Sequence, residues 1–590
     1  MLASALRHTR GSLLPLGLIA CGTFGVPPSG PSPSSAPTDE DTNATRTLRI
    51  LAINDFHGAL YEEADRADPS QRFGGLPWLA GTVDALRAEV PASILLDGGD
   101  SFQGSWPVNA THGEGSRLAF DLLDVNAAAV GNHEFDYGPG DGTGHPLRGA
   151  LNAAFAAAPG RWLATNITQE DGSPWQPEGL LPRRIIEVGG VRVGLFGLST
   201  EDTPTTTRTA FVADLRFTDV VPAAHQAATA LRDEGAEVVV LLGHLTGSCS
   251  PTSYTEPAPC SPGGEIGRLL EGLPDGLVDV MVLGHAHTLM AERKGNTFLL
   301  ENRHKGHLIG VLDLVVGAHG VDADASTLHP PVAVRHPPSE PGCDGGTWNL
   351  APATVAGRAV TPRPEAAKLI QSLEARTGSL CDPVGCTTAP FVRSRTELTP
   401  IAKLFADAML KATPDAEVAL TNAGGIRDNL PAGTISRGDV FAVMPFDNRL
   451  VTVQLTGAQL QLALRIGSSG AHGMILPAGL RYHFDPARTE GTDIDGDGDV
   501  SAWERDRLCS VHIGDAPLDP ARTYTVVTTD FLFGGGDHLG PAFAGVEIQH
   551  EGELLRDAIE AFIREHDGCM DPDASLNGTP RVIASPCTTP

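Results

Sequence analysis

The sequence predicts an α/β protein with more than one domain, and three observations support this fold class. The chain has 590 residues, whereas a single hydrophobic core rarely grows beyond about 250 to 300 residues. From residue 47 to about 345, short apolar runs rich in Val, Ile and Leu alternate with helical stretches, which is typical of strands buried on both faces of a layered sheet. A second α/β region runs from residue 380 to 565.

Apolar periodicity predicts the main elements of both regions. The expected strands of the first region are TLRILAI, ASILL, AAAV, VRVGLFGL, EVVVLL and VDVMVL. Pro, Ser and Gly are dense from about residue 337 to 364, and the helical pattern EAAKLIQSLEA follows, so we expect a linker and a connecting helix over residues 346–379. The second region begins with the amphipathic run IAKLFADAMLKA and continues through strands such as RLVTVQL and YTVVTT. Residues 566–590 are expected to form a C-terminal tail.

The charge balance excludes one class of partner. Lys and Arg total 42 against 72 Asp and Glu, which gives a formal net charge of −30. Such a charge repels the phosphates of DNA or RNA, so we expect no nucleic-acid binding. A small phosphorylated substrate stays compatible with this charge, because bound divalent metals reverse the local field.

The N-terminus has the features of an export signal. Arg7, His8 and Arg10 supply positive charge, and residues 11–20 form an apolar run too short to span a bilayer. The run ends in Leu-Ile-Ala-Cys21, which resembles the lipobox of bacterial lipoproteins. The resemblance implies cleavage before Cys21 and lipidation of that residue. An ordinary secretory signal with a chance cysteine is the alternative.

The segment after Cys21 predicts a flexible connection between the lipid anchor and the folded part of the protein. Residues 1–21 would be the signal peptide, and residues 22–46, rich in Pro and Ser, would form a disordered tether. We therefore expect an exported protein, anchored to the bacterial cell envelope only by its N-terminal lipid, on the periplasmic or cell-surface side.

The remaining eight cysteines predict disulfide bonds, because their number is even and the chain is expected to be exported. Short separations suggest the pairs Cys249 with Cys260, Cys381 with Cys386 and Cys569 with Cys587. The sequence alone does not settle the connectivity.

Potential metal ligands follow five of the apolar runs. They are Asp55 and His57, then Asp100, then Asn132, then His244, and last His285 and His287. Functional groups collect at the carboxyl edge of an open α/β sheet, so we expect these side chains to converge. Carboxylate, imidazole and amide ligands suit a pair of borderline divalent ions, bridged by one carboxylate, that activate water and clamp a phosphoryl group. Each motif alone would more often be a surface polar cluster.

A catalytic pair is expected next to these ligands. His133 lies three positions before Asp136, so the carboxylate can orient the imidazole. The imidazole can then stabilise charge on a phosphoryl or leaving oxygen.

The blocks NDFHG, GGDSFQG, GNHEFDYG, GHLT and GHAHT resemble the signature of calcineurin-like metallophosphoesterases, specifically the 5'-nucleotidase branch. The resemblance implies a four-layer α/β/β/α metallophosphoesterase sandwich over residues 47–345 and a substrate-binding α/β domain over residues 380–565. It implies that one metal is held by Asp55, His57, Asp100 and His287, and the other by Asp100, Asn132, His244 and His285. His133 and Asp136 match the catalytic dyad of the family.

Three blocks in the second region resemble the substrate-binding blocks of the same family. They are Thr421 to Arg427 (TNAGGIR), Pro445 to Asn448 (PFDN) and Phe531 to Asp537 (FLFGGGD). The resemblance implies that Asn422, Arg427 and Asn448 contact the nucleotide, that Phe446 and Phe531 sandwich the base, and that Asp537 binds the ribose hydroxyls. Arg393 and Arg395 are further candidates for a phosphate or ribose contact. The chain departs from the family pattern at residues 400–404, PIAKL.

A second metal signal lies in residues 493–504. The loop fits the EF-hand template, with ligand positions Asp493, Asp495, Asp497, Asp499 (through its backbone carbonyl), Ser501 and Glu504. No helical pattern precedes it, so we expect a single structural Ca²⁺ loop. An acidic solvated turn is the alternative.

The sequence therefore favours a phosphohydrolase that uses two divalent ions, Zn²⁺ or Mn²⁺, to dephosphorylate nucleoside 5'-monophosphates by attack of metal-activated water. A 2',3'-cyclic-nucleotide phosphodiesterase with 3'-nucleotidase activity, or a UDP-sugar hydrolase, is the alternative within the same fold. A non-catalytic calcium-binding surface protein is a remote alternative, because all seven ligand positions and the dyad are filled. The base preference, native metal and oligomeric state stay open.

Overall fold

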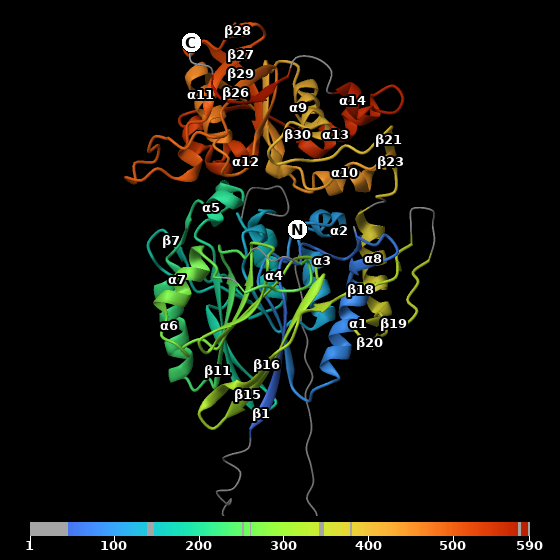
Figure 1. Ribbon diagram of the computed structural model, residues 1–590, viewed down its shortest axis with the longest axis vertical. Coiled ribbons are helices and arrows are strands. Elements are labelled where there is room, and N and C mark those ends of the chain that lie inside the picture. Colours follow the sequence, from blue (N-terminus) through green and yellow to red (C-terminus); the bar gives the residue numbers. More distant parts are fainter. Residues whose placement is uncertain are drawn as a thin grey trace, which may run out of the picture. The chain divides into compact units, whose positions relative to one another are not determined.

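Two β-sheets packed face to face form the centre of the first region (Figure 1). The computed structural model describes residues 45–65, 67–138, 147–249, 253–259, 261–341, 347–377, 380–575 and 580–587. The first sheet contains, in spatial order, β16 (Gly320–Leu328), β15 (Leu308–Gly317), β1 (Arg46–Ile53), β4 (Ser93–Asp97), β5 (Ala127–Ala129) and β6 (Trp162–Leu163), with β17 (Val332–Ala333) paired to β15. The second contains β13 (Leu289–Lys294), β14 (Thr297–Asn302), β12 (Val280–Gly284), β11 (Val238–His244), β9 (Val191–Ser199) and β8 (Arg183–Val188).

Helices cover the outer face of each sheet. The first sheet is covered by α1 (Leu76–Arg87), α3 (Glu114–Leu123), α4 (Gly149–Ala157) and α8 (Pro364–Thr377), and the second by α6 (Val220–Asp233) and α7 (Gly264–Gly272). Strand β1 shows why both faces are apolar: Leu48, Ile50 and Ala52 pack between the sheets, whereas Leu51 and Ile53 pack under the helices. The four α/β/β/α layers are those implied by the family resemblance.

The second region is built on a separate five-stranded sheet with its own apolar core. Its strands, in spatial order, are β25 (Ile475–Ala478), β22 (Val418–Asn422), β29 (Thr523–Thr529), β24 (Arg449–Thr456) and β30 (Ile548–Leu554). The main helices are α9 (Pro400–Ala412), α10 (Arg437–Val443), α11 (Gly457–Gly467) and α13 (Leu555–Arg564). The expected helix IAKLFADAMLKA is α9, and the expected strands RLVTVQL and YTVVTT lie in β24 and β29.

The C-terminal segment joins a second, four-stranded sheet. Its strand β31 (Val582–Ala584) pairs in parallel with β26 (Leu480–Phe484), which is next to β27 (Leu508–Ile513) and β28 (Ala516–Pro517). Two disulfides fix this segment, Cys386 to Cys569 and Cys509 to Cys587.

These disulfides correct two of the pairings suggested by sequence separation. Cys381 with Cys386 and Cys569 with Cys587 are both wrong, because the end of the chain folds back along β21 (Pro383–Thr387) and β26, which brings Cys569 to Cys386 and Cys587 to Cys509 of β27. Cys249 and Cys381 are also disulfide-bonded. Cys260, the suggested partner of Cys249, lies outside the described residues.

The N-terminal expectations also fall outside the structure. The predicted signal peptide 1–21, Cys21 and the tether as far as residue 44 are not among the described residues. Among the helices that are described, none has both the length and the apolar character needed to cross a bilayer.

Candidate active site

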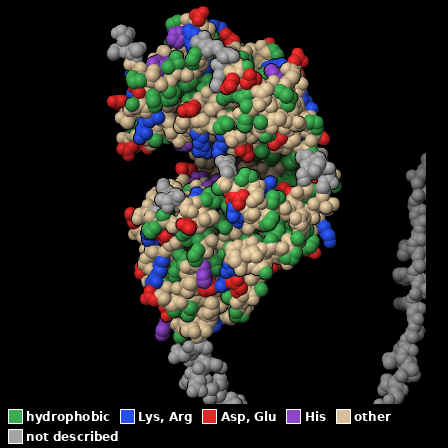
Figure 2. Space-filling view, turned by 45° about the vertical axis from the view of Figure 1, so that its right-hand side comes forward, with side chains coloured by type: hydrophobic (Ala, Val, Ile, Leu, Met, Phe, Trp, Pro, Cys, Tyr) green, Lys and Arg blue, Asp and Glu red, His purple; other side chains and the backbone are tan. Residues whose placement is uncertain are grey.

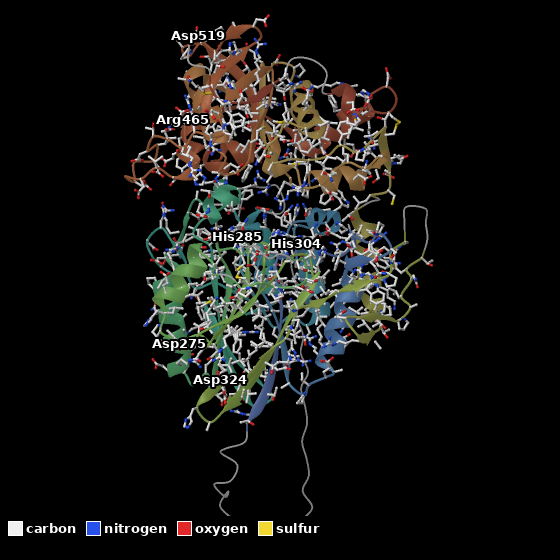
Figure 3. All side chains as sticks on the ribbon, in the orientation of Figure 1. Asp275, His285, His304, Asp324, Arg465 and Asp519 are labelled. Atoms are coloured by element: carbon white, nitrogen blue, oxygen red, sulfur yellow. A yellow bond between two sulfur atoms is a disulfide. The ribbon has the colours of Figure 1, made fainter. Side chains whose placement is uncertain are left out.

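The predicted metal ligands all lie at the carboxyl ends of parallel strands. Asp55 and His57 follow β1, Asp100 follows β4, Asn132 follows β5, His244 ends β11, and His285 and His287 follow β12. Figure 3 labels His285 at this edge, whereas Asp275 and Asp324 mark the opposite end of the sheets. The two packed sheets therefore deliver their ligands to one place.

The backbone at this edge is strained. Five of the seven ligands have positive φ angles, namely 48° at Asp55, 46° at His57, 57° at Asp100, 92° at His285 and 53° at His287. Such conformations cost about 1 to 3 kcal/mol each and persist where the surrounding structure imposes them, commonly at functional sites. Gly131 is required next to them, because a Cβ there would lie 2.1 Å from Oδ1 of Asp100.

One group of ligands consists of Asp55, His57 and His287. The Nε2 atoms of His57 and His287 are 3.2 Å apart, and Nε2 of His287 is 3.2 Å from Oδ1 of Asp55. Nδ1 of His57 lies 3.1 Å from the backbone oxygen of Gln103, so this nitrogen carries the proton and Nε2 presents a lone pair. Burial lowers the pKa of His57 to about 3, which keeps the ring neutral.

A second group consists of Asp100, Asn132, His244 and His285. Nε2 of His244 is 3.0 Å from Oδ2 of Asp100 and 3.1 Å from Oδ1 of Asn132. Nδ1 of His285 is 3.2 Å from that amide oxygen, and Nδ1 of His244 is 3.0 Å from the backbone oxygen of Gly98. The contact between Nδ1 of His244 and the Gly98 oxygen orients the His244 ring. The contact between Nδ1 of His57 and the Gln103 oxygen orients the His57 ring in the same way.

Asp100 lies between the two groups. Its Oδ2 is 3.0 Å from Nε2 of His244 and 3.9 Å from Nε2 of His57. Asp55 also lies within 4.8 Å of the ligand atoms of Asp100 and His244. Imidazole, carboxylate and amide lone pairs converge here, and this donor set fits two borderline divalent cations that share a carboxylate.

The expected catalytic pair is in contact beside these ligands. Nδ1 of His133 lies 2.5 Å from Oδ2 of Asp136, and the hydroxyl of Thr207 donates to the other carboxylate oxygen at 2.8 Å. Burial alone would lower the pKa of His133, but the charges of Asp136 and Asp100 outweigh it and raise the pKa to about 9. Thr207 has no sequence signal that could have identified it.

Glu134 was not singled out from the sequence, although it lies inside the GNHEF block. The side chain is buried, and its Oε1 accepts hydrogen bonds from the amide and hydroxyl of Ser101, both at 2.7 Å. Its Oε2 accepts from the amides of Asp100 at 3.1 Å and Gly131 at 2.7 Å. Glu134 therefore ties together the loops that carry Asp100 and Asn132.

A cavity of about 340 Å³ begins at these residues and extends to the second region. Its walls include Asp100, Asn132, His133, Asp136, His285 and His287 from the first region, and Asn422, Arg427, Phe446, Asn448, Phe531 and Asp537 from the second. All six expected nucleotide contacts thus face the same space. Figure 2 shows a hollow in the surface where basic and histidine side chains gather.

The aromatic and basic residues of the cavity are arranged around an open centre. The Phe446 ring lies nearly parallel to the His133 ring with centroids 6.0 Å apart, and the Arg427 guanidinium lies 5.5 Å from the Phe446 centroid. Burial, together with the neighbouring Arg395 and Arg393, lowers the pKa of Arg427 to about 10. Because Arg395 lines the same cavity, this wall favours an anion.

The EF-hand-like loop brings three of its expected ligands together. Ligand atoms of Asp493, Asp495 and Glu504 lie within 4.8 Å of one another. Asp497 and Asp499 are exposed, and the Ser501 amide donates to Oε2 of Glu504 at 2.7 Å. The residues before the loop form turns and a β-bridge between Gly491 and Arg505 instead of a helix, as the sequence predicts.

Comparison with known protein families gives two matches. Residues 48–289 match the model of the calcineurin-like phosphoesterases, and residues 383–545 match that of the 5'-nucleotidase C-terminal domain. Together the two matches cover well over half of the chain.

Among curated proteins, the cell wall protein Lmo0130 of Listeria monocytogenes is 26% identical over 558 residues, covering 86% of this chain and 65% of its own length. The trifunctional nucleotide phosphoesterase YfkN of Bacillus subtilis is 25% identical, covering 83% of this chain and 32% of its own. The chain therefore spans less than two thirds of these relatives. Protein UshA of Yersinia enterocolitica is 24% identical, covering 89% of this chain and 92% of its own length.

Solved structures show the same fold. A 5'-nucleotidase precursor from Thermus thermophilus superposes with a TM-score of 0.67 at 23% identity, covering 92% of this chain and 99% of its own. The sulfate thiohydrolase SoxB from Thermus thermophilus has a TM-score of 0.64 at 18% identity, covering 91% and 96%.

Proposed function

This chain belongs to the 5'-nucleotidase family of calcineurin-like phosphoesterases, which are hydrolases of phosphate esters, and we propose that it removes phosphate from nucleoside 5'-monophosphates. The observation that supports this substrate is the cavity shared by both regions. It places the metal-ligand cluster and His133 at one side and Phe446, Phe531 and Asp537 at the other. A phosphate and a nucleoside would thus occupy one continuous space.

At the phosphate end, the seven ligands would hold two divalent ions. When bound, the ions neutralise phosphoryl charge and lower the pKa of a coordinated water. His133 is held by Asp136, which is held by Thr207, so its Nε2 points away from the carboxylate and toward the ligand cluster, 4.0 Å from Oδ2 of Asp100. A protonated His133 in this position stabilises negative charge on the phosphoryl or leaving oxygen.

At the nucleoside end, Phe446 and Phe531 would hold the base between their faces, because aromatic rings stack on any base. Asn422 donates a hydrogen bond to Oδ2 of Asp537 at 2.7 Å, which leaves the remaining lone pairs of that carboxylate for ribose hydroxyls. Arg427 and Arg395 supply positive charge along the wall between the two ends, and Asn448 completes the expected contacts.

Other nucleotide esters are the second candidate. The name of the YfkN relative describes a trifunctional nucleotide phosphoesterase. The same cavity would also suit the substrate of a 2',3'-cyclic-nucleotide phosphodiesterase or of a UDP-sugar hydrolase. The non-catalytic alternative requires a degenerate ligand set, which the converging lone pairs described above oppose.

The remaining proposals concern ions and location. We propose Zn²⁺ or Mn²⁺ at the catalytic ligands and a structural Ca²⁺ at residues 493–504. Export with a lipid on Cys21 is supported by the signal-like N-terminus, and one relative is named a cell wall protein.

The test is hydrolysis of AMP, 2',3'-cyclic AMP and UDP-glucose by metal-stripped protein restored with Mn²⁺ or Zn²⁺, followed as phosphate from AMP, as 3'-AMP and its phosphate from the cyclic ester, and as UMP and its phosphate from UDP-glucose. We expect metal-dependent release that is fastest from AMP and is lost in Asp100→Ala. A matched control is Glu187→Ala, because Glu187 is an exposed acid on β8, remote from the cavity. Folded, metal-loaded protein that releases phosphate from none of the three would refute the nucleotidase assignment.

A further inference from the structure

The cavity residue Asp537 lies in an unusual stretch of backbone. Asp537 and the next residue, His538, have φ angles of 53° and 62°. The left-handed conformation costs a residue with a Cβ atom about 1 to 2 kcal/mol. Two such residues in succession need contacts that hold them.

On the cavity side, the Asp537 carboxylate accepts the hydrogen bond from Asn422. This contact fixes one oxygen of the side chain. The turn itself is closed by a backbone hydrogen bond from the Leu539 amide to the Gly536 oxygen at 3.1 Å, and the His538 ring supplies a further restraint.

The His538 ring lies nearly parallel to two neighbouring rings. The indole of Trp503 lies nearly parallel to it at 4.8 Å between centroids, and the His472 ring lies at 4.9 Å. Nε2 of His472 is 2.8 Å from Nδ1 of His538. Burial lowers the pKa of His538 to about 4, so a neutral ring takes part in these contacts. His472 itself lines the cavity beside Asp537.

Trp503 is in turn fixed by the EF-hand-like loop. Its neighbour Glu504 is fully buried and accepts hydrogen bonds from the amides of Ile494 and Ser501, at 2.5 and 2.7 Å. The backbone oxygen of Glu504 accepts a hydrogen bond from Arg465 of α11 at 3.2 Å. The indole therefore has a defined position in the apolar core of the second region.

We propose that Trp503 is a positioning residue for the nucleoside site: through its stack on His538 it holds Asp537 in the left-handed conformation that aims the carboxylate at the ribose. The proposal rests on the proposed function, because it requires a nucleotide in the cavity. Trp503, His538 and His472 lie outside the residues that the family blocks assign to the substrate. Trp503 is not among the described residues that line the cavity, so we expect its effect on recognition of the ribose and not on the hydrolytic step.

The experiment compares Trp503→Ala with wild type, using the full chain loaded with Mn²⁺ and three substrates. These are AMP, 2',3'-dideoxyadenosine 5'-monophosphate, which lacks the ribose hydroxyls, and p-nitrophenyl phosphate, which lacks a nucleoside. We expect the KM for AMP to rise about tenfold, the effect of losing a hydrogen bond to a charged group. The KM for the dideoxy substrate and the hydrolysis of p-nitrophenyl phosphate should stay unchanged.

Two further variants keep the test decisive. Trp503→Phe retains an aromatic face and should restore the KM for AMP, whereas Val500→Ala changes an exposed residue of the same loop and should have no effect. If Trp503→Ala fails to fold, as loss of p-nitrophenyl phosphate hydrolysis would report, His538→Ala removes the same stack and is expected to raise the KM for AMP alone.

An equal rise in KM for AMP and its dideoxy analogue, or no rise for either, would overturn the positioning role. Wild-type protein that cleaves p-nitrophenyl phosphate but not AMP would instead overturn the nucleotidase assignment, so the two failures are distinguishable.

Discussion

Oε2 of Glu134 accepts a hydrogen bond from the backbone amide of Asp100 at 3.1 Å, although the two residues belong to loops after different strands. The same oxygen accepts from Gly131. One buried carboxylate therefore sets the distance between Asp100, expected to bridge both metals, and Asn132, expected to bind one of them.

We expect Glu134→Gln to lower metal affinity and kcat by about 10- to 100-fold, the usual effect of removing a residue that orients metal ligands. The glutamine NH₂ group would face backbone N–H donors, which leaves a buried donor without an acceptor. Isothermal titration calorimetry with the metal measures the metal affinity, and steady-state hydrolysis of AMP measures kcat. The exposed Glu187→Gln is the control, and equal metal affinity in wild type and Glu134→Gln would refute the role.

The metal-ligand cluster was predictable from the hydrophobic pattern of the strands and from the position of each ligand directly after a strand. Strands buried on both faces appear as continuous apolar runs, and the polar residue after each run must lie at the sheet edge. Asp55 and His285 are far apart in sequence, yet this rule places them together, and the His285 amide lies 3.1 Å from Oδ2 of Asp55.

The residues that the sequence did not identify act through contacts between elements. Thr207 reaches Asp136 from a loop after another strand, and His472 reaches Asp537 through His538. Neither residue has a local pattern, because its role depends on how two distant segments pack. The predicted disulfide pairings were wrong for the same reason. The separation of two cysteines along the chain does not show that the C-terminal segment folds back and forms β31.

Substitutions of His133 and Thr207 should lower kcat by different amounts, which tests the dyad. We expect His133→Gln to lower kcat by about 10² to 10⁴, the range for a lost general acid or charge-stabilising group. Thr207→Val removes one hydrogen bond to Asp136 and should cost about tenfold or less. Steady-state kinetics on AMP with saturating metal measures both. A Thr207→Val loss as large as that of His133→Gln would contradict this order.

The disulfides are checked by peptide mapping without reduction. We expect linked peptides that contain Cys386 with Cys569 and Cys509 with Cys587. Replacing Cys509 and Cys587 by Ala should lower the free energy of unfolding by about 2 to 5 kcal/mol, measured by urea denaturation. A peptide joining Cys381 to Cys386 would contradict the structure.

The proposed calcium loop contains both a residue whose side chain is needed for Ca²⁺ binding and one whose side chain is not, so it supplies its own control variant. We expect Ca²⁺ to raise the thermal midpoint of the protein, with about 2.7 kcal/mol of stabilisation at a hundredfold excess over Kd. Glu504→Gln should abolish the increase, because both carboxylate oxygens are needed at the twelfth position. Asp499→Ala should retain it, because position seven binds through its backbone carbonyl. Loss of the increase in both variants would indicate that the loop simply unfolds.

Asp313 on β15 supplies a pH-dependent contribution to stability. Its carboxylate accepts hydrogen bonds from Nε and Nη2 of Arg49 at 2.7 and 2.8 Å, and lies 2.8 Å from Nε2 of His329. Partial burial would raise the pKa of Asp313, but Arg49 and His329 outweigh it and hold the pKa below its usual value.

A carboxylate with a depressed pKa in the folded state stabilises the protein above its unfolded pKa, about 3.9, and loses this contribution as the pH falls through the folded value. The difference in unfolding free energy between wild type and Asp313→Asn should therefore be largest at about pH 6 and shrink below about pH 4. Urea denaturation of metal-free protein across this range measures it. Asp515→Asn, at a fully exposed side chain, is the control, and a difference that grows as the pH falls would reverse the assigned sign.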